Sequence, residues 1–502
     1  MKNILQMLEK DAKLYPQKIA FEDMDGAITY SELLQRSRQL GSYIASLGIK
    51  GKPIVILLKQ SVNTVISMMG ILYSGNFYCV LDYDSPDDRI QNIISTLEPK
   101  FIITDDESKE KSQQSFSLQS IALSEAGEEI NDKVLDEIRR AQSDTDPAYV
   151  LFTSGSTGVP KGAVLSHLNV LKYSKWLTET FDYNENTVLG NQTPFYFSMS
   201  VSDIFGALRC GGQVQIIPKM YFSFPLKLLQ YINEKQINTI YWVPTALCIV
   251  ANWKALDYEE LPGLKKVLFA GEVMPVKQLN MWMDKLPDAL FANLFGPTET
   301  TDICTYYILD RRLANDESVP IGVSCDNCPC LVIKEDGTLA EKPGESGELY
   351  ARGSFLSAGY YNNPEKTAAA FVQNPLNKSY PETVYKTGDI VSINEYGELI
   401  YLSRADFQIK HMGYRIELGE IEAAANSVEK INFCACVYDK ESDDIILVYQ
   451  GRKIDNESLS EQISNKLPHY MMPTKMYKLK EIPFNANGKI DRKWILNNYK
   501  NF

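Results

Sequence analysis

Histidine is scarce in this chain of 502 residues, in which only His167, His411 and His469 are present. A serine hydrolase needs a histidine that works with a nucleophilic serine, and a Gly-x-Ser-x-Gly turn often carries that serine. No such turn accompanies any of the three histidines. The sequence therefore argues against hydrolase chemistry of this kind.

Positive charge is in the minority. The chain has 51 lysine and arginine residues against 64 aspartate and glutamate residues, which gives a formal net charge of -13. No segment concentrates lysine and arginine. Because nucleic acids and anionic membrane surfaces are bound through basic patches, neither is expected as the main partner.

The chain also lacks a long uninterrupted apolar run. Residues 60–81 carry no charge, but small and polar residues such as Gly70 and Gly75 divide them into a predicted helix, turn and strand. At the N-terminus, the charged residues 9–11 interrupt the apolar pattern before a secretory core could form, and a surface helix is predicted. A cytoplasmic location is expected.

Nine cysteines, an odd number in a long chain, favour reduced thiols over a disulfide framework. The group Cys325-x-x-Cys328-x-Cys330 could suggest a metal, but no second pair or histidine stands at a usable spacing, so a metal is the less favoured interpretation. Cys434 and Cys436 alternate along one face of a predicted strand and are expected in the core.

Apolar runs alternate with helical patterns, which indicates an α/β architecture. A chain of this length also exceeds a single hydrophobic core, so two or more structural units are expected. The polar segment 106–115 is predicted to be a surface loop, and residues 332–416 are richer in short strands and turns. The predicted buried strands are 54–58, 101–103, 240–243 and 267–270, and a helical spacing joins Val170, Tyr173, Trp176 and Leu177.

A loop of small residues follows a buried strand in the segment Leu-Phe-Thr-Ser-Gly-Ser-Thr-Gly-Val-Pro-Lys-Gly, residues 151–162. Gly155 and Gly158 let the backbone turn its amide groups into one concavity, to which hydroxyl groups and Lys161 add donors and charge. This pattern predicts a site for a nucleotide triphosphate. It differs from a Walker A loop, which needs four residues between its glycines and a serine or threonine after the lysine, where this chain has Gly162.

The segment from Thr153 to Gly162 resembles the signature of the acyl-adenylating superfamily, which includes acyl-CoA synthetases, luciferases and the adenylation domains of nonribosomal peptide synthetases. Further matches follow in the family's order along nearly the whole chain, and on this ordered set the chain is identified as a member. The matching segments are 28–33 (ITYSEL), 295–300 (FGPTET), 347–349 with 359–360, 385–389 (YKTGD), 403–410, 413–420 and 487–492 (NGKIDR).

The resemblance implies a fold of two domains. A large N-terminal domain, residues 1–404, comprises two α/β subdomains plus a small β-barrel and binds ATP and the acid. A smaller, mobile α+β domain, residues 405–502, carries the catalytic lysine. Asp406 matches the hinge between the two orientations that the family uses, and Gly413 is expected to line a thiol tunnel in the second of them.

The resemblance also implies ATP and Mg²⁺ as cofactors. Glu299 matches the magnesium ligand and Thr298 a contact to the α-phosphate, and both join Lys489 as the catalytic set. Asp389 is expected to accept hydrogen bonds from the ribose, with Arg404 beside it. A catalytically inactive nucleotide-binding relative is the rival interpretation, but the charged positions are all filled, which favours an enzyme. The implied ATP site comprises Thr153, Ser154, Gly155, Ser156, Thr157, Gly158, Lys161, Gly296, Thr298, Asp389 and Arg404.

The family's acid pocket can be carried over residue by residue. Amino-acid enzymes usually have an aspartate where this chain has Ser198, and a serine cannot pair with an α-ammonium group. Asp302 and Tyr241 could instead receive a hydroxyl or amino group distant from the carboxylate, as in an aryl acid or a β-amino acid. The alternative is that Asp302 faces away and caps local backbone. The pocket positions are Phe197, Ser198, Met199, Ser202, Tyr241, Leu268, Ala270, Leu294, Asp302 and Ile303.

The thiol acceptor is expected to be a separate carrier protein with a phosphopantetheine arm, because only a few residues follow Lys489. Segments 408–410 and 415–422 resemble the peptide-synthetase and D-alanine-ligase branch more than the fatty acyl-CoA branch, so CoA is the second choice. A D-alanine carrier protein ligase is the runner-up, on the strength of overall length and residues 270–275. Ser198 counts against it.

Overall fold

The computed structural model describes residues 1–153, 160–314, 317–405, 408–452, 454–483 and 490–502. The chain divides into two compact units. The first comprises residues 1–82, 98–151 and 162–405, and the second comprises residues 83–97, 152–161 and 406–502. Two short segments from within residues 1–404 therefore group with the second unit. Asp406, the expected hinge, lies outside the described residues.

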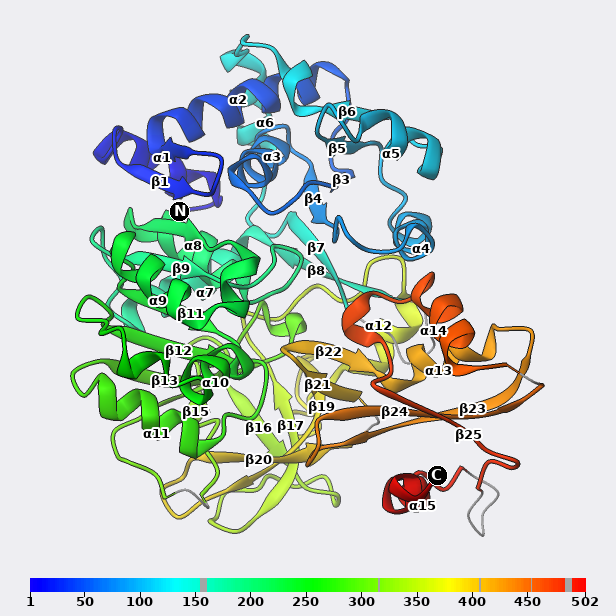
Figure 1. Ribbon diagram of the computed structural model, residues 1–502. Coiled ribbons are helices and arrows are strands. Elements are labelled where there is room, and N and C mark those ends of the chain that lie inside the picture. Colours follow the sequence, from blue (N-terminus) through cyan, green and yellow to red (C-terminus); the bar gives the residue numbers. More distant parts are fainter. Residues whose placement is uncertain (154–159, 315–316, 406–407, 453, 484–489) are drawn as a thin grey trace. The chain divides into compact units, whose positions relative to one another are not determined.

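A nine-stranded sheet in the first unit has the order β15-β14-β13-β12-β11-β9-β10-β1-β2 (Figure 1). Strands β1, β10, β9, β11, β12 and β13 are all parallel to one another. Strand β2 pairs antiparallel with β1, β14 with β13, and β15 with β14. The central strands are almost continuously buried, as parallel strands covered on both faces are. The bounds are β1 Ile19–Glu22, β2 Ala27–Thr29, β9 Val188–Asn191, β10 Gln213–Ile216, β11 Thr239–Trp242, β12 Lys266–Ala270, β13 Leu290–Phe295, β14 Thr305–Ile308 and β15 Val323–Ser324.

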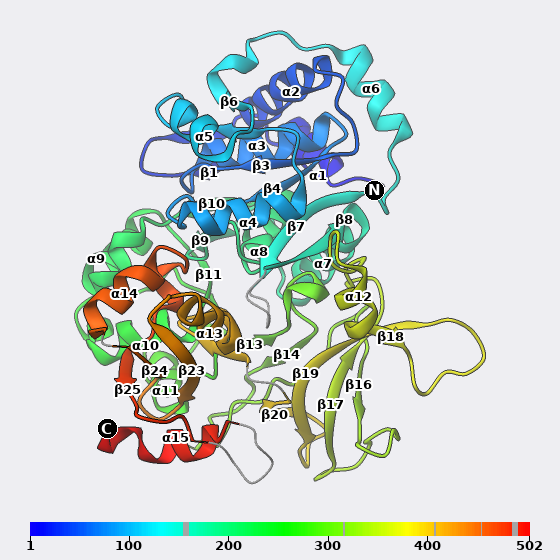
Figure 2. The ribbon, with the colours of Figure 1, turned by 90° about the vertical axis from the view of Figure 1, so that its right-hand side faces the viewer.

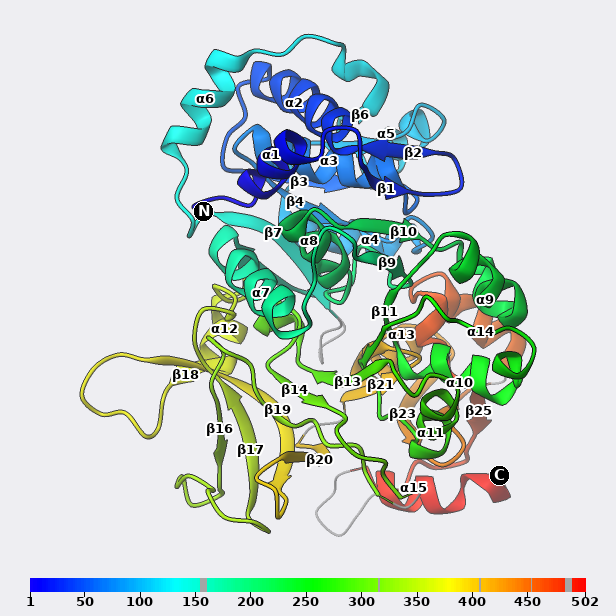
Figure 3. The same cartoon turned by 90° about the vertical axis from the view of Figure 1, so that its left-hand side faces the viewer.

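Helices connect these strands and cover the sheet. Figure 3 shows α7 beside α8, and the two helices pack closely on each other. Proline at the first helical position begins both α9 and α10, where its missing N–H costs nothing. The bounds are α7 His167–Thr180, α8 Ser200–Cys210, α9 Pro225–Glu234, α10 Pro244–Asn252 and α11 Val276–Lys285.

A six-stranded sheet has the order β6-β5-β3-β4-β7-β8. Helix α3 packs on β3 and β4, and α2 packs on α3, as Figure 2 shows. The motif at residues 28–33 begins α2, because Thr29 and Glu32 form a reciprocal capping box. The bounds are β3 Pro53–Ile56, β4 Phe77–Val80, β5 Ile102–Thr104, β6 Ser120–Ala122, β7 Pro147–Thr153, β8 Lys161–Ser166, α1 Leu5–Leu14, α2 Tyr30–Ser46, α3 Val62–Tyr73, α5 Lys109–Phe116 and α6 Asp132–Ala141.

A five-stranded antiparallel sheet completes the first unit and stands where the resemblance implies a small barrel. Its path is β16-β17-β19-β18, with β20 paired to β19. The long strand β19 therefore pairs with three other strands, β17, β18 and β20. The bounds are β16 Cys330–Ile333, β17 Ser346–Ala351, α12 Pro364–Ala370, β18 Phe371–Gln373, β19 Thr383–Ile393 and β20 Leu399–Arg404.

The second unit has its own hydrophobic core, built on a three-stranded sheet of β23, β24 and β25 and a separate hairpin of β21 and β22. Helix α4 belongs to this unit, and its buried Arg89 forms an ion pair with Glu420 of α13. Gly413 occupies the hairpin turn with a φ of 80°, a conformation that favours glycine. The bounds are α4 Asp87–Leu97, β21 Gln408–His411, β22 Tyr414–Glu417, α13 Leu418–Asn426, β23 Ile431–Asp439, β24 Asp444–Gly451, α14 Asn456–Ser464, β25 Lys475–Lys478 and α15 Arg492–Asn498.

Most predicted elements are confirmed. The four apolar runs are β3, β5, β11 and β12, residues 60–81 contain α3 and β4, and Cys434 and Cys436 are buried in β23. No helix among the described residues is both long and apolar enough to cross a membrane.

Two predictions are wrong. Residues 106–115 are not a loop, because α5 forms there and buries Ser112 and Phe116 beside β5 and β6. The N-terminal helix is present as α1, but it is not a simple surface helix. Leu5, Met7 and Leu8 are fully buried, and α1 packs against α2 and α8.

Candidate active site

The motif at residues 295–300 forms a tight loop after β13, followed by a 3₁₀ turn at Thr298–Thr300. A Cβ atom at Gly296 would lie 2.6 Å from both the Asp302 carbonyl oxygen and the Cys304 amide nitrogen, so only glycine fits there. Thr301 has a φ of 71°, which a β-branched residue rarely adopts. Its hydroxyl donates to the Phe355 carbonyl at 2.8 Å. Strain of this kind is held in place by surrounding contacts and is common at functional sites.

Glu299 lies fully buried at the centre of this loop. The Tyr360 hydroxyl donates to its Oε1 at 2.6 Å, and the Ser357 amide donates to its carbonyl at 2.8 Å. The segment 357–361 also pairs with β8, since the Val164 and Tyr361 amides donate to the Gly359 and Gly162 carbonyls respectively. One segment therefore holds Glu299 and adjoins the strand that follows the small-residue loop. Thr298, next to Glu299, is also buried.

The small-residue loop itself is only partly described. Ser154, Gly155, Ser156, Thr157 and Gly158 lie outside the described residues. Thr153 ends β7 and Lys161 begins β8, and the Thr153 hydroxyl lies 3.5 Å from the Lys161 carbonyl oxygen. The two ends of the loop are thus adjacent.

Asp389 and Arg404 face each other across β19 and β20, where they are register partners. Their side chains form a buried ion pair at 3.0 Å, and Arg404 also donates to the Thr387 carbonyl at 2.7 Å. The Thr387 hydroxyl accepts from the Asp389 amide at 3.0 Å, and Gly388 between them has a φ of 75°. The carboxylate and the guanidinium are therefore fixed as one unit.

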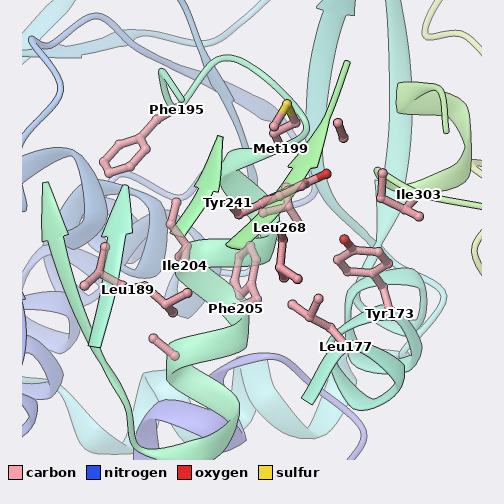
Figure 4. Close-up of a cluster of buried hydrophobic side chains, with 14 of the residues drawn as sticks. Tyr173, Leu177, Leu189, Phe195, Met199, Ile204, Phe205, Tyr241, Leu268 and Ile303 are labelled. Atoms are coloured by element: carbon pink, nitrogen blue, oxygen red, sulfur yellow. The ribbon is translucent and has the colours of Figure 1, made fainter. Parts of the chain in front are cut away.

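A second buried carboxylate, Asp302, lies among side chains from three separate elements. Its Oδ2 accepts hydrogen bonds from Tyr173 on α7 at 2.8 Å, Ser202 on α8 at 2.9 Å and Tyr241 on β11 at 3.1 Å. The Tyr173 and Ser202 hydroxyls also bond to each other at 2.6 Å. Figure 4 shows the hydroxyls of Tyr173 and Tyr241 turned toward the same region, near Met199 and Ile303.

The electrostatics of Asp302 follow from this cage. Burial raises its pKa to about 6, and the hydroxyls of Tyr173, Ser202, Tyr241 and Ser198 oppose that rise. The carboxyl group is therefore largely ionised at pH 7. Within the described part of the chain, no lysine, arginine or histidine forms an ion pair with it. The Asp302 carboxylate is thus a buried negative charge that is stabilised by hydroxyl groups, with no cationic partner among the described residues.

The other predicted pocket residues differ in burial. Phe197 and Ser198 are partly exposed, whereas the remaining positions are buried and apolar. The Asp302 carboxylate accepts from side-chain hydroxyls of distant elements, whereas the alternative interpretation expected it to cap local backbone. The buried apolar positions are Met199, Leu268, Ala270, Leu294 and Ile303.

The sequence did not predict a functional role for two residues near the site, Tyr173 and Tyr360. Tyr173 was predicted only as part of the apolar face of a helix, and Tyr360 only as part of a motif. A buried tyrosine has the same helical spacing whether or not its hydroxyl meets a carboxylate, so no sequence signal separates the two cases. Lys489 lies outside the described residues. Among the residues that are described, no group of three or more His, Cys, Asp or Glu side chains is arranged to hold a metal ion.

Comparisons with known proteins identify the family of the chain and its fold. The model of a family described as AMP-binding enzyme matches residues 8–361. Zwittermicin A synthase ZmaJ of Bacillus cereus is 31% identical over 98% of this chain and 94% of its own length. A D-alanine--D-alanyl carrier protein ligase of Bacillus cytotoxicus is 31% identical over 98% of this chain and 99% of its own. The adenylation domain AlmE of Vibrio cholerae, solved with glycyl-adenosine-5'-phosphate, shares the fold with a TM-score of 0.85, 22% identity and coverage of 99% and 98% of the two chains.

Proposed function

Since the chain belongs to the AMP-binding enzyme family and is an adenylate-forming ligase, we propose that it activates a carboxylic acid for transfer to a thiol. In the first step the acid attacks the α-phosphorus of ATP, which forms an acyl-adenylate and releases pyrophosphate. In the second step the phosphopantetheine thiol of a separate carrier protein displaces AMP and forms a thioester.

The first step brings two anions together, so the site must supply cations and aligned donors. We assign Asp389 to the ribose hydroxyls, with Arg404 held beside it by their ion pair. Thr298 contacts the α-phosphate, and Lys489 contacts the acid's carboxylate and the α-phosphate oxygen. The small-residue loop from Thr153 to Lys161 receives the phosphates.

The residues present suit Mg²⁺. Magnesium is usually held by one or two carboxylates together with phosphate oxygens, and Glu299 is a buried carboxylate without an acidic cluster around it in the described residues. When bound, the ion would neutralise charge on the phosphates. The Tyr360 hydroxyl fixes Glu299 Oε1 and so sets where that carboxylate points.

The second step is assigned to residues 405–502 as a domain that turns about Asp406 relative to residues 1–404. Gly413, in the turn of the β21–β22 hairpin, is assigned to the thiol tunnel. A carrier protein is preferred as acceptor because one group of relatives is named for such a partner, the D-alanyl carrier protein. CoA is the alternative acceptor.

The acid is proposed to be a hydroxy- or aminobenzoate-like acid or a β-amino acid, and one observation carries this proposal. Asp302 is a buried carboxylate bound by hydroxyls and without a described cationic partner. An amino group on the acid would supply the missing countercharge, and a hydroxyl group would add another donor. A fatty acyl chain would instead offer this carboxylate neither a positive charge nor a hydrogen-bond donor.

A second candidate, D-alanine or another α-amino acid, is favoured by one specific contact. The Ser198 hydroxyl helps to lower the pKa of Asp302, so the two side chains are neighbours. The carboxylate of Asp302 is therefore close to the position at which amino-acid enzymes carry aspartate, and it could serve an α-ammonium group instead.

Carboxylate-dependent exchange of labelled pyrophosphate into ATP separates these candidates. The panel should contain aminobenzoates, hydroxybenzoates, β-amino acids, D-alanine, other α-amino acids and short aliphatic acids. Exchange with benzoates or β-amino acids alone supports the first proposal, and exchange with D-alanine supports the second.

Three variants complete this experiment. Asp302→Asn should change the preferred acid, whereas Asp203→Asn should not, because Asp203 is an equally buried carboxylate that bonds to Asn191 instead. Lys489→Ala should lose adenylate formation while it keeps its fold. Unchanged exchange in Lys489→Ala would contradict the assigned catalytic role.

A further inference from the structure

The hairpin of β21 and β22 closes with a turn of two residues, Met412 and Gly413. Both have a positive φ, 50° for Met412 and 80° for Gly413, as in the type I′ turns that close tight hairpins. Glycine adopts this conformation readily, but a methionine does so only under strain, and surrounding contacts must hold such strain in place. The register partners on either side of the turn are His411 and Tyr414. The contacts of these two side chains therefore bear directly on the position of Gly413.

Side-chain contacts, rather than a shared sheet, connect this turn to the rest of the second unit. Among the described strands, β21 and β22 pair with each other, and β23, β24 and β25 form a separate sheet. After the turn, Tyr414 stacks on Tyr470 of the 3₁₀ turn His469–Met471, with ring centroids 3.8 Å apart and an interplanar angle of 16°. Before the turn, His411 is buried and contacts the segment that joins β23 to β24. The turn is thus anchored at both of its ends.

The anchor at His411 is a polar one. Its Nδ1 lies 3.0 Å from Oδ1 of Asp443. The Tyr438 hydroxyl donates to the same oxygen, and the Tyr438 ring stands nearly perpendicular to the imidazole, at 77° with centroids 6.0 Å apart. Because an ionised carboxylate only accepts hydrogen bonds, Nδ1 carries the proton, and this fixes both the tautomer and the orientation of the ring. These residues, 411, 438 and 443, form the His411 cluster.

A hydrogen bond at this place does what apolar packing alone does not. An aliphatic side chain would fill the space of the imidazole, but it would not fix a direction, whereas a hydrogen bond weakens steeply when its geometry is lost. Asp443 also has a positive φ, 56°, which aspartate adopts more often than most residues do. The carboxylate that receives His411 is therefore itself presented by a tight turn, and the two turns are held in a defined relation.

We propose that His411 is a positioning residue for the thioester-forming step, because the His411 cluster holds the turn that contains Gly413. The inference rests on the proposed function, in which Gly413 lines the path of the thiol. Adenylate formation is assigned to other residues and does not depend on this turn. Loss of the hydrogen bond to Asp443 should therefore slow thioester formation roughly tenfold to a hundredfold, since a misplacement of about 1 Å has effects of that size, and should leave pyrophosphate exchange unchanged.

The two half-reactions test this role in the full-length protein. With an acid that supports pyrophosphate exchange, thioester formation is followed with pantetheine as the thiol. His411→Ala should lose thioester formation selectively. His411→Asn keeps an N–H donor near the position of Nδ1 and should restore most of the rate, whereas His411→Gln places its donor near the position of Nε2 and should not.

Variants at two other positions complete the comparison. Asp443→Gly removes the carboxylate but tolerates the positive φ, so it should match His411→Ala. The double variant should be no slower than either single one, because both changes remove the same contact. His469→Ala is the matched control, since His469 is an exposed histidine of the same unit, and it should keep both half-reactions.

Two further measurements need no acid. The chain has only three histidines, so labelling them with ¹⁵N gives three imidazole groups to resolve by NMR, and His411→Ala identifies the signals of His411. The wild type should have the proton on Nδ1, and Asp443→Gly should lose this preference. Amide hydrogen exchange of a peptide that covers residues 408–417 should be faster in His411→Ala than in the wild type, and unchanged in His469→Ala.

The outcomes separate this inference from the proposed function. Thioester formation by His411→Ala at the wild-type rate would overturn the inference, as would an equal loss of both half-reactions or unchanged hydrogen exchange across residues 408–417. If no acid supports pyrophosphate exchange even in the wild type, the proposed function fails. Hydrogen exchange and the tautomer then still decide whether the His411 cluster holds the turn, because faster exchange supports that role and unchanged exchange contradicts it.

Discussion

Replacing Asp302 by asparagine should make the protein more stable while it weakens recognition of the acid. The pKa of Asp302 rises from 3.8 to about 6 in the folded protein, chiefly through burial. The folded state therefore binds more protons than the unfolded state between about pH 4 and pH 6. Stability contributed by this residue consequently falls as pH rises through that window, and the full cost is present above about pH 6.

The size of the effect follows from the shift. A difference of about two pKa units, at about 1.4 kcal/mol per unit, corresponds to about 3 kcal/mol at pH 7. Asparagine removes the buried charge and keeps an oxygen that can accept from Tyr173, Ser202 or Tyr241. Because its amide group must find new partners among the same hydroxyls, we expect a net gain of about 1–3 kcal/mol.

Urea unfolding of the wild type and of Asp302→Asn at pH 7 and at pH 4 measures this difference. The variant should have the higher midpoint at pH 7, and its advantage should shrink toward pH 4, where the wild-type carboxyl is protonated in the folded state and no buried charge remains. Asp389→Asn is a control for which the opposite change in stability is expected. It removes the charged partner of Arg404 and should lower the free energy of unfolding. A variant at Asp302 that is less stable at pH 7, or an advantage that does not depend on pH, would refute the reasoning.

Three further predictions concern activity. With an amine-bearing acid, kcat/KM of the wild type should fall as pH drops below about 6, because protonation removes the charge of Asp302. This acidic limb of the pH profile should be absent in Asp302→Asn. Pyrophosphate exchange measured across the pH range tests both statements. Tyr173→Phe removes a donor that lowers the pKa of Asp302, so the same limb should move to higher pH while Tyr241 still supports binding. Tyr360→Phe should lower the exchange rate roughly tenfold to a hundredfold, since a hydrogen bond to the Glu299 carboxylate is lost, and unchanged exchange would argue against a positioning role.

The sequence was sufficient for most elements of the fold because long apolar runs leave few alternatives. Strands β11 and β12 lie in continuous apolar segments, and their burial follows directly. Helix α5 was missed because a short helix with only two buried residues has the composition of a loop. The one-sided burial of α1 depends on which helices pack against it, and a single amphipathic segment does not reveal its neighbours.

For the candidate site, too, the sequence predicted some features and missed others. Motif order identified Glu299, Asp389 and Arg404, but it gave no contacts. The Tyr173–Asp302 bond joins residues 129 positions apart, and the pairing of Cys304 with Cys325 arises only from the register of β14 and β15. Such contacts depend on how helices and strands meet in three dimensions, so local pattern could not supply them.

The short segment from Gly296 to Asp302 combines several features that lower the stability of the fold, and the proposed roles of its residues explain why they occur together. It contains a glycine that admits no side chain, a threonine with positive φ, and two buried carboxylates, Glu299 and Asp302. Each feature is unfavourable for folding alone. In the proposed function, however, Thr298 and Glu299 serve the phosphates and Asp302 serves the acid. Because only a few residues of one rigid loop separate these groups, the loop itself fixes the acid relative to the nucleotide. Loss of that alignment, rather than loss of either binding contact, should then dominate when the backbone of Gly296 or Thr301 is disturbed.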